Sequence, residues 1–323
     1  MYHKQACCYV FFIILHTKTI YIYCKGTMKA ISRNAVIGYP AGIITGITYG
    51  LNPLFAVPLM KAGASTETIL FFRYGFSVLL LGTFLLLGGK SFKVSLRQGG
   101  ILLLLGILYT TSSLCLFEAY NYIASGLATT LVFLYPILVA IIMVFLRVVP
   151  SWPVWVAIAL TFLGVAIMTQ GGAGDAANPV GMLLSICSAF AYAFFIVIIN
   201  RSKAIRSISN SLLTFYALLV GAIAFFMKIA FSDSNITAGI DGCAAWANLI
   251  GLALLPTIVS TATLAVATRN IGATKASVLG VFEPVTAILV GTVVFGETLT
   301  ANIVAGISIA VAAVTFMIAL TKR

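Results

Sequence analysis

Charged residues are scarce in this chain of 323 amino acids. They make up 8% of the residues, whereas 61% are hydrophobic. Soluble globular domains carry about 25% charged residues, so a water-soluble fold of this size would lack the polar groups that cover a surface. The same composition excludes disorder, which requires low hydrophobicity. The bilayer is therefore the solvent, and we expect an integral membrane protein.

Residues that build catalytic and metal centres are also rare. The two histidines, His3 and His16, lie near the N-terminus, the three aspartates lie outside the apolar runs, and no pair of the six cysteines has C-x-x-C spacing. These absences exclude a Ser–His dyad, a histidine-ligated zinc or haem and an intramembrane aspartyl dyad. No Walker A pattern occurs, so ATP is not the direct energy source. We expect no enzyme, no metal and no cofactor.

Ten apolar runs are long enough to cross a bilayer, which takes about 20 helical residues. They are Gly38–Leu59, Ile69–Gly88, Gly99–Tyr120, Ser125–Leu146, Trp152–Thr169, Val180–Asn200, Ser211–Phe231, Ala247–Ala267, Ala276–Phe295 and Ala301–Leu320. Backbone groups in lipid must bond internally, so the runs predict helices. The fold class is an all-α membrane protein with ten transmembrane helices. We interpret residues 1–34 as an N-terminal tail and expect residues 1–27 to be an upstream extension, with translation starting at Met28; the alternative is a short interfacial segment.

The basic residues between these runs are strongly biased to one side. Lys61 is the one Lys or Arg in the loops opposite the N-terminus, while the loops on the N-terminal side are basic. Positive loops stay in the cytoplasm, so both termini are expected there, in a multi-pass protein of the cell membrane. The net charge of +12 is spread over short loops, and we expect no nucleic-acid partner.

The chain contains an internal repeat. Residues 119–140 align with residues 267–288 at a constant offset, with identities at Ala119/Ala267, Ile123/Ile271, Ala128/Ala276, Leu131/Leu279 and Pro136/Pro284. Each copy would hold five helices, and because five is odd the second copy would be inverted in the membrane. Inverted repeats are typical of secondary transporters, which bind solutes near the bilayer midplane between the copies.

Four segments resemble a known family: FFRYG at 71–75, ATTLVFLYP at 128–136, KASVLGVFEPV at 275–285 and FGETLT at 295–300. The chain resembles proteins with two EamA domains, in the drug/metabolite transporter superfamily, here at 35–170 and 180–320. The resemblance implies a ten-helix transporter, and many such proteins export amino acids, metabolites or drugs. One departure is that Val149 stands where the second copy has Glu297.

Glu283 is the leading candidate for function, because ionisable groups inside spans are costly. It follows Lys275 by eight residues, about 12 Å into a core of roughly 30 Å. Pro284 follows it and frees a backbone carbonyl. We expect Glu283 to carry a proton or pair with a cationic substrate; the alternative is a neutral carboxyl that holds helices together.

Six further residues are expected to line a polar and aromatic cavity: Tyr49, Asn52, Tyr135, Tyr192, Ser112 and Ser260. Tyr135 precedes proline at the position aligned with Glu283. Asn52 either donates to substrate or satisfies carbonyls freed by the nearby prolines. The two serines lie in hydroxyl-rich stretches, and such hydroxyls also bond the preceding turn of their own helix. The expected substrate is a small amphipathic molecule.

Arg73 and Glu118 are expected to form a structural ion pair that offsets the burial of both. Glu67 is an alternative partner for Arg73, and anion recognition by Arg73 is the alternative role. Gly42, Gly46 and Gly50 form a stripe with four-residue spacing. Such stripes allow close helix approach, so we expect packing in preference to a flexible gate.

These observations predict a secondary-active transporter, an exporter by the resemblance, which works by alternating access on a small-molecule substrate, with protons as a candidate coupling ion. An uncoupled facilitator and a membrane partner protein without transport activity are the alternatives.

Overall fold

The computed structural model describes residues 33–123, 125–169, 178–231, 237, 239–295 and 300–321, which are helix, turn or coil throughout. Apart from its last two residues, the expected tail lies outside this part of the chain, as does the proposed start at Met28. Among the described residues, seven helices are long and apolar enough to cross a membrane, and Tyr135–Phe145, Trp152–Gly164 and Val304–Leu320 are shorter apolar helices. These ten segments confirm the expected all-α membrane fold.

Both halves contain five spans. The first half consists of α2 (Arg33–Tyr49), α3 (Asn52–Lys61), α4 (Thr66–Leu87), α5 (Leu96–Ala119), α6 (Ser125–Val132), α7 (Tyr135–Phe145) and α8 (Trp152–Thr169). The second half consists of α9 (Pro179–Arg201), α10 (Asn210–Ala230), α11 (Gly242–Leu252), η1 (Ala253–Val259), α12 (Ser260–Ile271), α13 (Ala273–Val278), η2 (Leu279–Val281), α14 (Phe282–Phe295) and α15 (Ala301–Thr321).

Polar caps mark where several spans begin. Ser65, Ser209 and Asn178 each accept a hydrogen bond from a backbone amide in the first turn of α4, α10 and α9, respectively. Ser95 and Gln98 form a reciprocal capping box at the start of α5. These caps satisfy amides that have no partner within the helix, and so fix the ends of the spans.

Four spans are broken rather than continuous. The first breaks at Gly50–Leu51, before Pro53, and the fourth breaks between α6 and α7, before Pro136. The eighth contains the π-helical segment η1 around Pro256, and the ninth changes to a 3₁₀ turn at η2 just before Pro284. Proline has no amide hydrogen and clashes with the preceding turn, which accounts for a break beside each of these residues.

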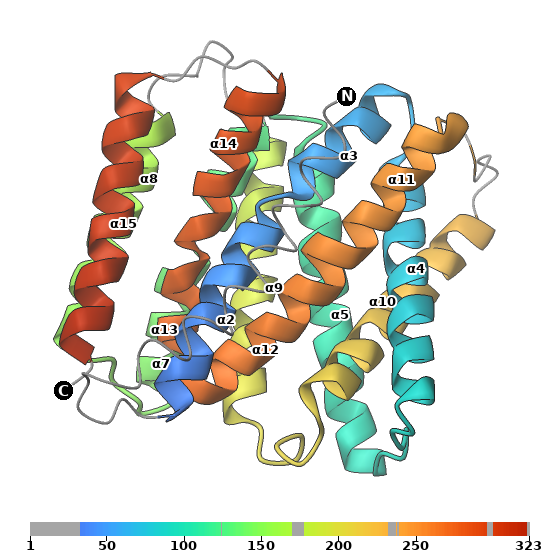
Figure 1. Cartoon of the computed structure of the whole chain (residues 1–323), viewed down its shortest axis with the longest axis horizontal. Helices are drawn as coiled ribbons and strands as arrows, with labels where there is room; N and C mark the ends of the chain where they lie inside the picture. Colours follow the sequence, from blue (N-terminus) through green and yellow to red (C-terminus); the bar gives the residue numbers. More distant parts are fainter. Residues whose placement is uncertain are drawn as a thin grey trace, which may run out of the picture.

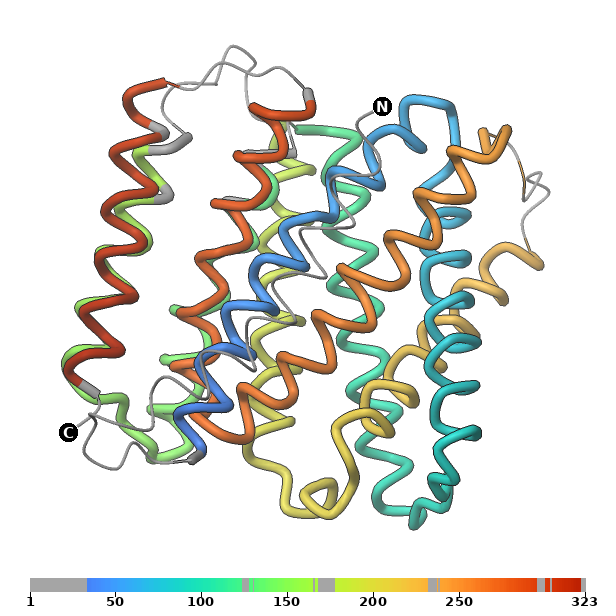
Figure 2. Tube along the Cα trace, in the orientation of Figure 1, coloured from blue at the N-terminus to red at the C-terminus, as the bar shows by residue number. Residues whose placement is uncertain are grey.

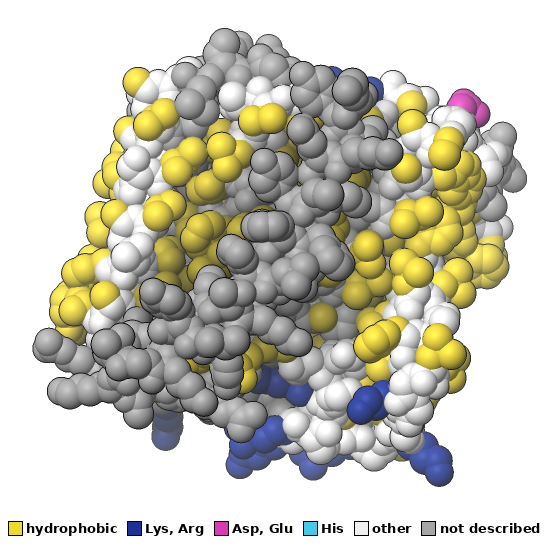
Figure 3. All heavy atoms as spheres, viewed as in Figure 1, with side chains coloured by type: hydrophobic (Ala, Val, Ile, Leu, Met, Phe, Trp, Pro, Cys, Tyr) yellow, Lys and Arg dark blue, Asp and Glu magenta, His cyan; other side chains and the backbone are white. Residues whose placement is uncertain are grey.

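The spans form one bundle in which helices from the two halves pack in pairs. α2 lies against α12, α5 against α9, α4 against α10, and α8 against α15 at one edge of the bundle (Figures 1 and 2). α2 begins and α15 ends at the same end of the bundle, as ten passes require. Lys and Arg side chains gather at that end, while hydrophobic side chains cover the flanks (Figure 3).

The glycine stripe on α2 faces the broken ninth span. A Cβ atom at Gly46 would lie 2.7 Å from Cβ of Phe282 and 3.0 Å from the backbone oxygen of Leu279. A Cβ atom at Gly50 would lie 2.5 Å from the backbone oxygen of Glu283. At Gly42 it would overlap the Leu279 side chain. Only glycine lets the α2 backbone approach η2 and α14 this closely.

We predict that Gly46→Ala destabilises the protein by about 1–3 kcal/mol, because the added methyl group meets the backbone of η2. Gly75→Ala on α4 is the matched control, since a Cβ there would meet nothing within 4 Å. Thermal unfolding of both purified variants in detergent measures the difference. Equal midpoints for the two variants would contradict the proposed close contact.

Candidate functional site

Glu283 lies in the first turn of α14 and is 3% exposed. Its Oε1 atom has no hydrogen-bond partner, while the Tyr135 side chain lies close enough to interact with the carboxyl group. The sequence repeat thus places its two aligned positions, Tyr135 and Glu283, in contact with one another.

Asn52 occupies the corresponding first turn of α3 and is 2% exposed. Neither its Nδ2 nor its Oδ1 atom has a hydrogen-bond partner. A buried amide without partners costs about 1–3 kcal/mol, so such groups are rare in folded proteins. The structure therefore gives no support to the alternative in which Asn52 satisfies carbonyls freed by the neighbouring prolines.

Asn52 and Glu283 line one narrow pocket between the two halves. The first half contributes α2, α3, α5 and α6 to its wall, and the second half contributes α14. The lining residues are Tyr49, Gly50, Asn52, Pro53, Leu116, Tyr120, Thr129, Glu283 and Ala287. The free space is about that of a single water molecule, so the pocket is closed around its polar groups in this conformation.

Three of the expected tyrosines form an aromatic cluster beside Glu283. Tyr49 stacks on Tyr192 with ring centroids 5.8 Å apart, and Tyr135 meets Tyr192 edge-on at 4.9 Å. The stack continues from Tyr192 to Phe195 at 6.2 Å and from Phe195 to Tyr109 at 5.2 Å. Glu283 and Asn52 thus adjoin a wall of rings, and a planar or hydrophobic solute group would pack well against it.

The two predicted serines lie elsewhere. Ser112 pairs with Ser188 at 3.1 Å across the contact between α5 and α9, and Ser188 also donates to the backbone oxygen of Ser112. Ser260 is buried beside α2, where its backbone oxygen accepts hydrogen bonds from Thr45 and Thr263. Neither serine is among the residues that line the pocket, and both lie where helices pack.

The structure corrects the expected ion pair. Among the described residues Arg73 makes no ion pair with Glu118, whose Oε2 accepts from Asn121 at 3.2 Å. Arg73 instead donates to Thr257. The carboxylate of Glu67 pairs with Lys228 at 2.7 Å, near the ends of α4 and α10. The position of each residue along its span predicted its depth in the membrane, but it did not predict which neighbouring helix the side chain would face.

Sequence reasoning missed part of the pocket wall. Leu116 lies on α5, and Tyr120 follows four residues later at the C-terminal end of that helix, so both side chains line the pocket from the same face. The Tyr120 hydroxyl lies 3.5 Å from the hydroxyl of Thr129 on α6. The four-residue spacing was a usable signal, but helical spacing alone does not say which partner a face meets.

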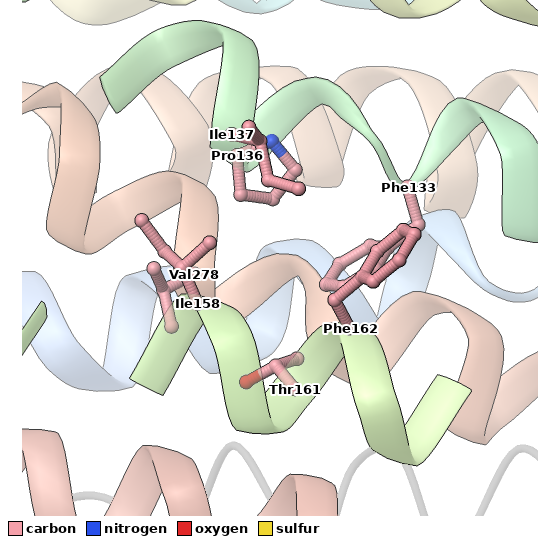
Figure 4. Close-up of a pocket in the computed structure, with 7 residues that line it drawn as sticks. All are labelled: Phe133, Pro136, Ile137, Ile158, Thr161, Phe162 and Val278. Carbon is pink, nitrogen blue, oxygen red and sulfur yellow. The ribbon is translucent and has the colours of Figure 1, made fainter. Parts of the chain in front are cut away.

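A second small pocket lies between the α6–α7 break, α8 and α13 (Figure 4). Its lining is Phe133, Pro136, Ile137, Ile158, Thr161, Phe162 and Val278. This wall is almost entirely hydrocarbon, and the buried hydroxyl of Thr161 has no partner. Such a lining offers a solute little to recognise, and we interpret the pocket as a packing gap at the broken helix.

Comparison with solved structures supports the fold. A chain described only as "Crystal structure of protein" superposes with a TM-score of 0.70 at 16% sequence identity, covering 88% of this chain and 98% of that one. At this identity the likeness concerns the fold alone. The search of curated proteins finds no match.

The family comparison covers nearly all of the described chain. The model of the EamA-like transporter family matches twice, at residues 36–170 and 179–319. These two matches coincide with the two five-helix halves and with the two sides of the pocket. Membership of this family implies membrane transport of small molecules, and the family is not an enzyme family. The chain belongs to the EamA-like transporter family.

Proposed function

We propose that this protein is a secondary-active exporter of small metabolites, amino acids or drug-like molecules, and that the pocket between its halves is the solute site. The observation that carries the proposal is that Asn52 and Oε1 of Glu283 are buried in one pocket without partners. A transported solute would supply the missing hydrogen bonds. Solvated space would open when one half rocks against the other, as alternating access requires.

The broken helices support this role. Asn52, Tyr135 and Glu283 stand in the first turns of α3, α7 and α14; Asn52 and Glu283 share the pocket, and Tyr135 interacts with Glu283. Discontinuous helices in transporters place backbone dipoles and freed carbonyls at the solute site. In this proposal Glu283 exchanges a proton or an ammonium group of the solute, and Tyr135 holds the carboxyl group of Glu283 in place through its contact with it.

We predict that Glu283→Gln abolishes proton-coupled flux, because glutamine keeps the shape of the side chain but cannot carry a proton. Proteoliposomes that enclose a pH-sensitive dye are exposed to a panel of amino acids and small amines, and internal pH is followed. Glu118→Gln is the matched control, since that carboxyl group contacts Asn121 outside the pocket.

The same assay separates the competing functions. Uptake of a labelled solute by the native protein without any change in internal pH would indicate an uncoupled facilitator and overturn the coupling role of Glu283. A protein that moves no member of the panel would favour the non-transporting alternative.

We predict opposite effects of Asn52→Leu on stability and on transport. Leucine has nearly the same shape and removes two unpartnered polar atoms, so the unfolding midpoint should stay unchanged or rise. Solute uptake should fall to the level of empty liposomes. Asn200→Leu is the control. Asn200 donates a hydrogen bond to the backbone oxygen of Thr268 at 3.0 Å, so loss of this bond should lower the unfolding midpoint.

A lowered midpoint for Asn52→Leu with unchanged uptake would show that Asn52 is structural.

We further propose that both termini face the cytoplasm, from the bias of basic loops. A membrane-impermeant amine reagent should then modify Lys61 in intact cells and Lys203 only after permeabilisation, since both side chains are exposed at opposite ends of the bundle. Peptide mass spectrometry reads out both sites. Modification of both lysines in intact cells would overturn the inverted arrangement.

A further inference from the structure

Arg73 is fully buried, and the described part of the chain supplies it with no counter-ion. Its side chain is 0% exposed, and among the described residues no carboxylate lies within 4 Å of it. Its Nη1 atom has no hydrogen-bond partner. A guanidinium ion remains charged in proteins, and an uncompensated buried charge costs several kcal/mol. A cost of this size calls for a negative partner that is not part of the described chain.

The other side of the guanidinium is held by η1. Nε of Arg73 donates to Oγ1 of Thr257 at 2.6 Å, and Nη2 lies 3.5 Å from the backbone oxygen of Pro256. Because Pro256 has no amide hydrogen, the backbone oxygen of Leu252 is left without its usual helical donor, and the Thr257 hydroxyl donates to it at 2.8 Å. Thr257 is therefore fixed as an acceptor for Arg73, which leaves the Nη1 side of the fork free.

Aromatic rings flank the guanidinium. Its central carbon lies 5.3 Å from the ring centroid of Phe117 and 5.9 Å from that of Tyr74. Such contacts contribute about 0.5–2 kcal/mol and do not neutralise the charge. They do exclude water, and a dry setting strengthens the attraction between the guanidinium and an anion.

Arg73 adjoins the pocket that contains Asn52 and Glu283. Leu116 and Tyr120 line that pocket, and Phe117, between them on α5, contacts the guanidinium. The pocket residues Tyr49 and Tyr120 each interact electrostatically with both Arg73 and Glu283. A buried cation and a buried carboxyl group thus both lie within electrostatic range of the same two tyrosines.

We propose that Arg73 is an anion subsite of the solute pocket, and that its Nη1 receives a compact anionic group, a carboxylate of the solute. The inference rests on the proposed function, because it assumes that the pocket opens to solutes. Thr257 is a positioning residue that orients the fork. A small carboxylate with a planar or hydrophobic body would then meet Arg73 at its charged end and the tyrosines along its length.

Ligand-dependent thermal unfolding of the full chain in lipid nanodiscs tests this subsite without requiring transport. The probes are sodium benzoate, its uncharged analogue benzamide, and sodium chloride at matched ionic strength. Benzoate should raise the unfolding midpoint of the native protein with increasing concentration, and benzamide should not. Arg73→Gln should abolish the response, and Arg73→Lys should weaken apparent affinity by about tenfold or more, since lysine has no planar fork.

Four further variants keep the test decisive. Arg201→Gln removes an exposed positive charge and should respond like the native protein. Thr257→Val should weaken the benzoate response and Thr257→Ser should restore it, which tests the subsite even if Arg73→Gln does not fold. Glu283→Gln should keep the benzoate response, so a Glu283→Gln variant that binds benzoate and still carries out proton-coupled flux would overturn the coupling role in the proposed function and leave the subsite intact.

The outcomes assign the anion. A response to benzoate that exceeds the response to chloride assigns the subsite to a solute carboxylate, whereas an Arg73-dependent response to chloride of equal size keeps the anion site and assigns it to an inorganic ion. If neither anion raises the midpoint of the native protein, or if Arg73→Gln responds as the native protein does, Arg73 is structural and the proposal is wrong.

Discussion

Every backbone amide and carbonyl group in this protein needs a hydrogen-bond partner, and the structure depends on this constraint. Lipid provides no such partner, so an unsatisfied amide or carbonyl group is tolerated at membrane depth only inside the protein or beside water. Four spans are nevertheless broken, and three of the breaks meet at Asn52, Tyr135 and Glu283. The close approach of α2, which its glycines permit, covers the break at η2 and closes the pocket over it.

Some of the polar groups without hydrogen-bond partners lie in or beside that pocket. Asn52, Glu283 and Arg73 contain such buried atoms, and the other described residues that do so are Asn210 and five threonines. A fold selected only for stability would fill such positions with hydrocarbon. The placement of Asn52, Glu283 and Arg73 beside a stack of tyrosines is the pattern expected of a recognition site held ready for a solute, at a cost to stability.

Much of the fold was predictable because it depends on composition and period. The ten spans follow from apolar length, and the aligned prolines Pro136 and Pro284 marked two helix breaks at equivalent places. The placement of Glu283 in a polar, aromatic pocket followed from its depth. Helix rotation was not predictable: Ser112 faces Ser188, and Arg73 meets Thr257 rather than Glu118, because one chain gives no signal for which helix faces which.

The π-helical segment η1 makes the two halves unequal. Its counterpart in the first half, α5, is a continuous helix from Leu96 to Ala119, while the eighth span carries a wider turn around Pro256. A wider turn accommodates one surplus residue and rotates everything that follows it by roughly 100°. The two halves are consequently not related by an exact twofold axis. If the halves rock as proposed, the openings on the two sides of the membrane would be lined differently, and a solute would meet a different sequence of polar contacts on entering than on leaving.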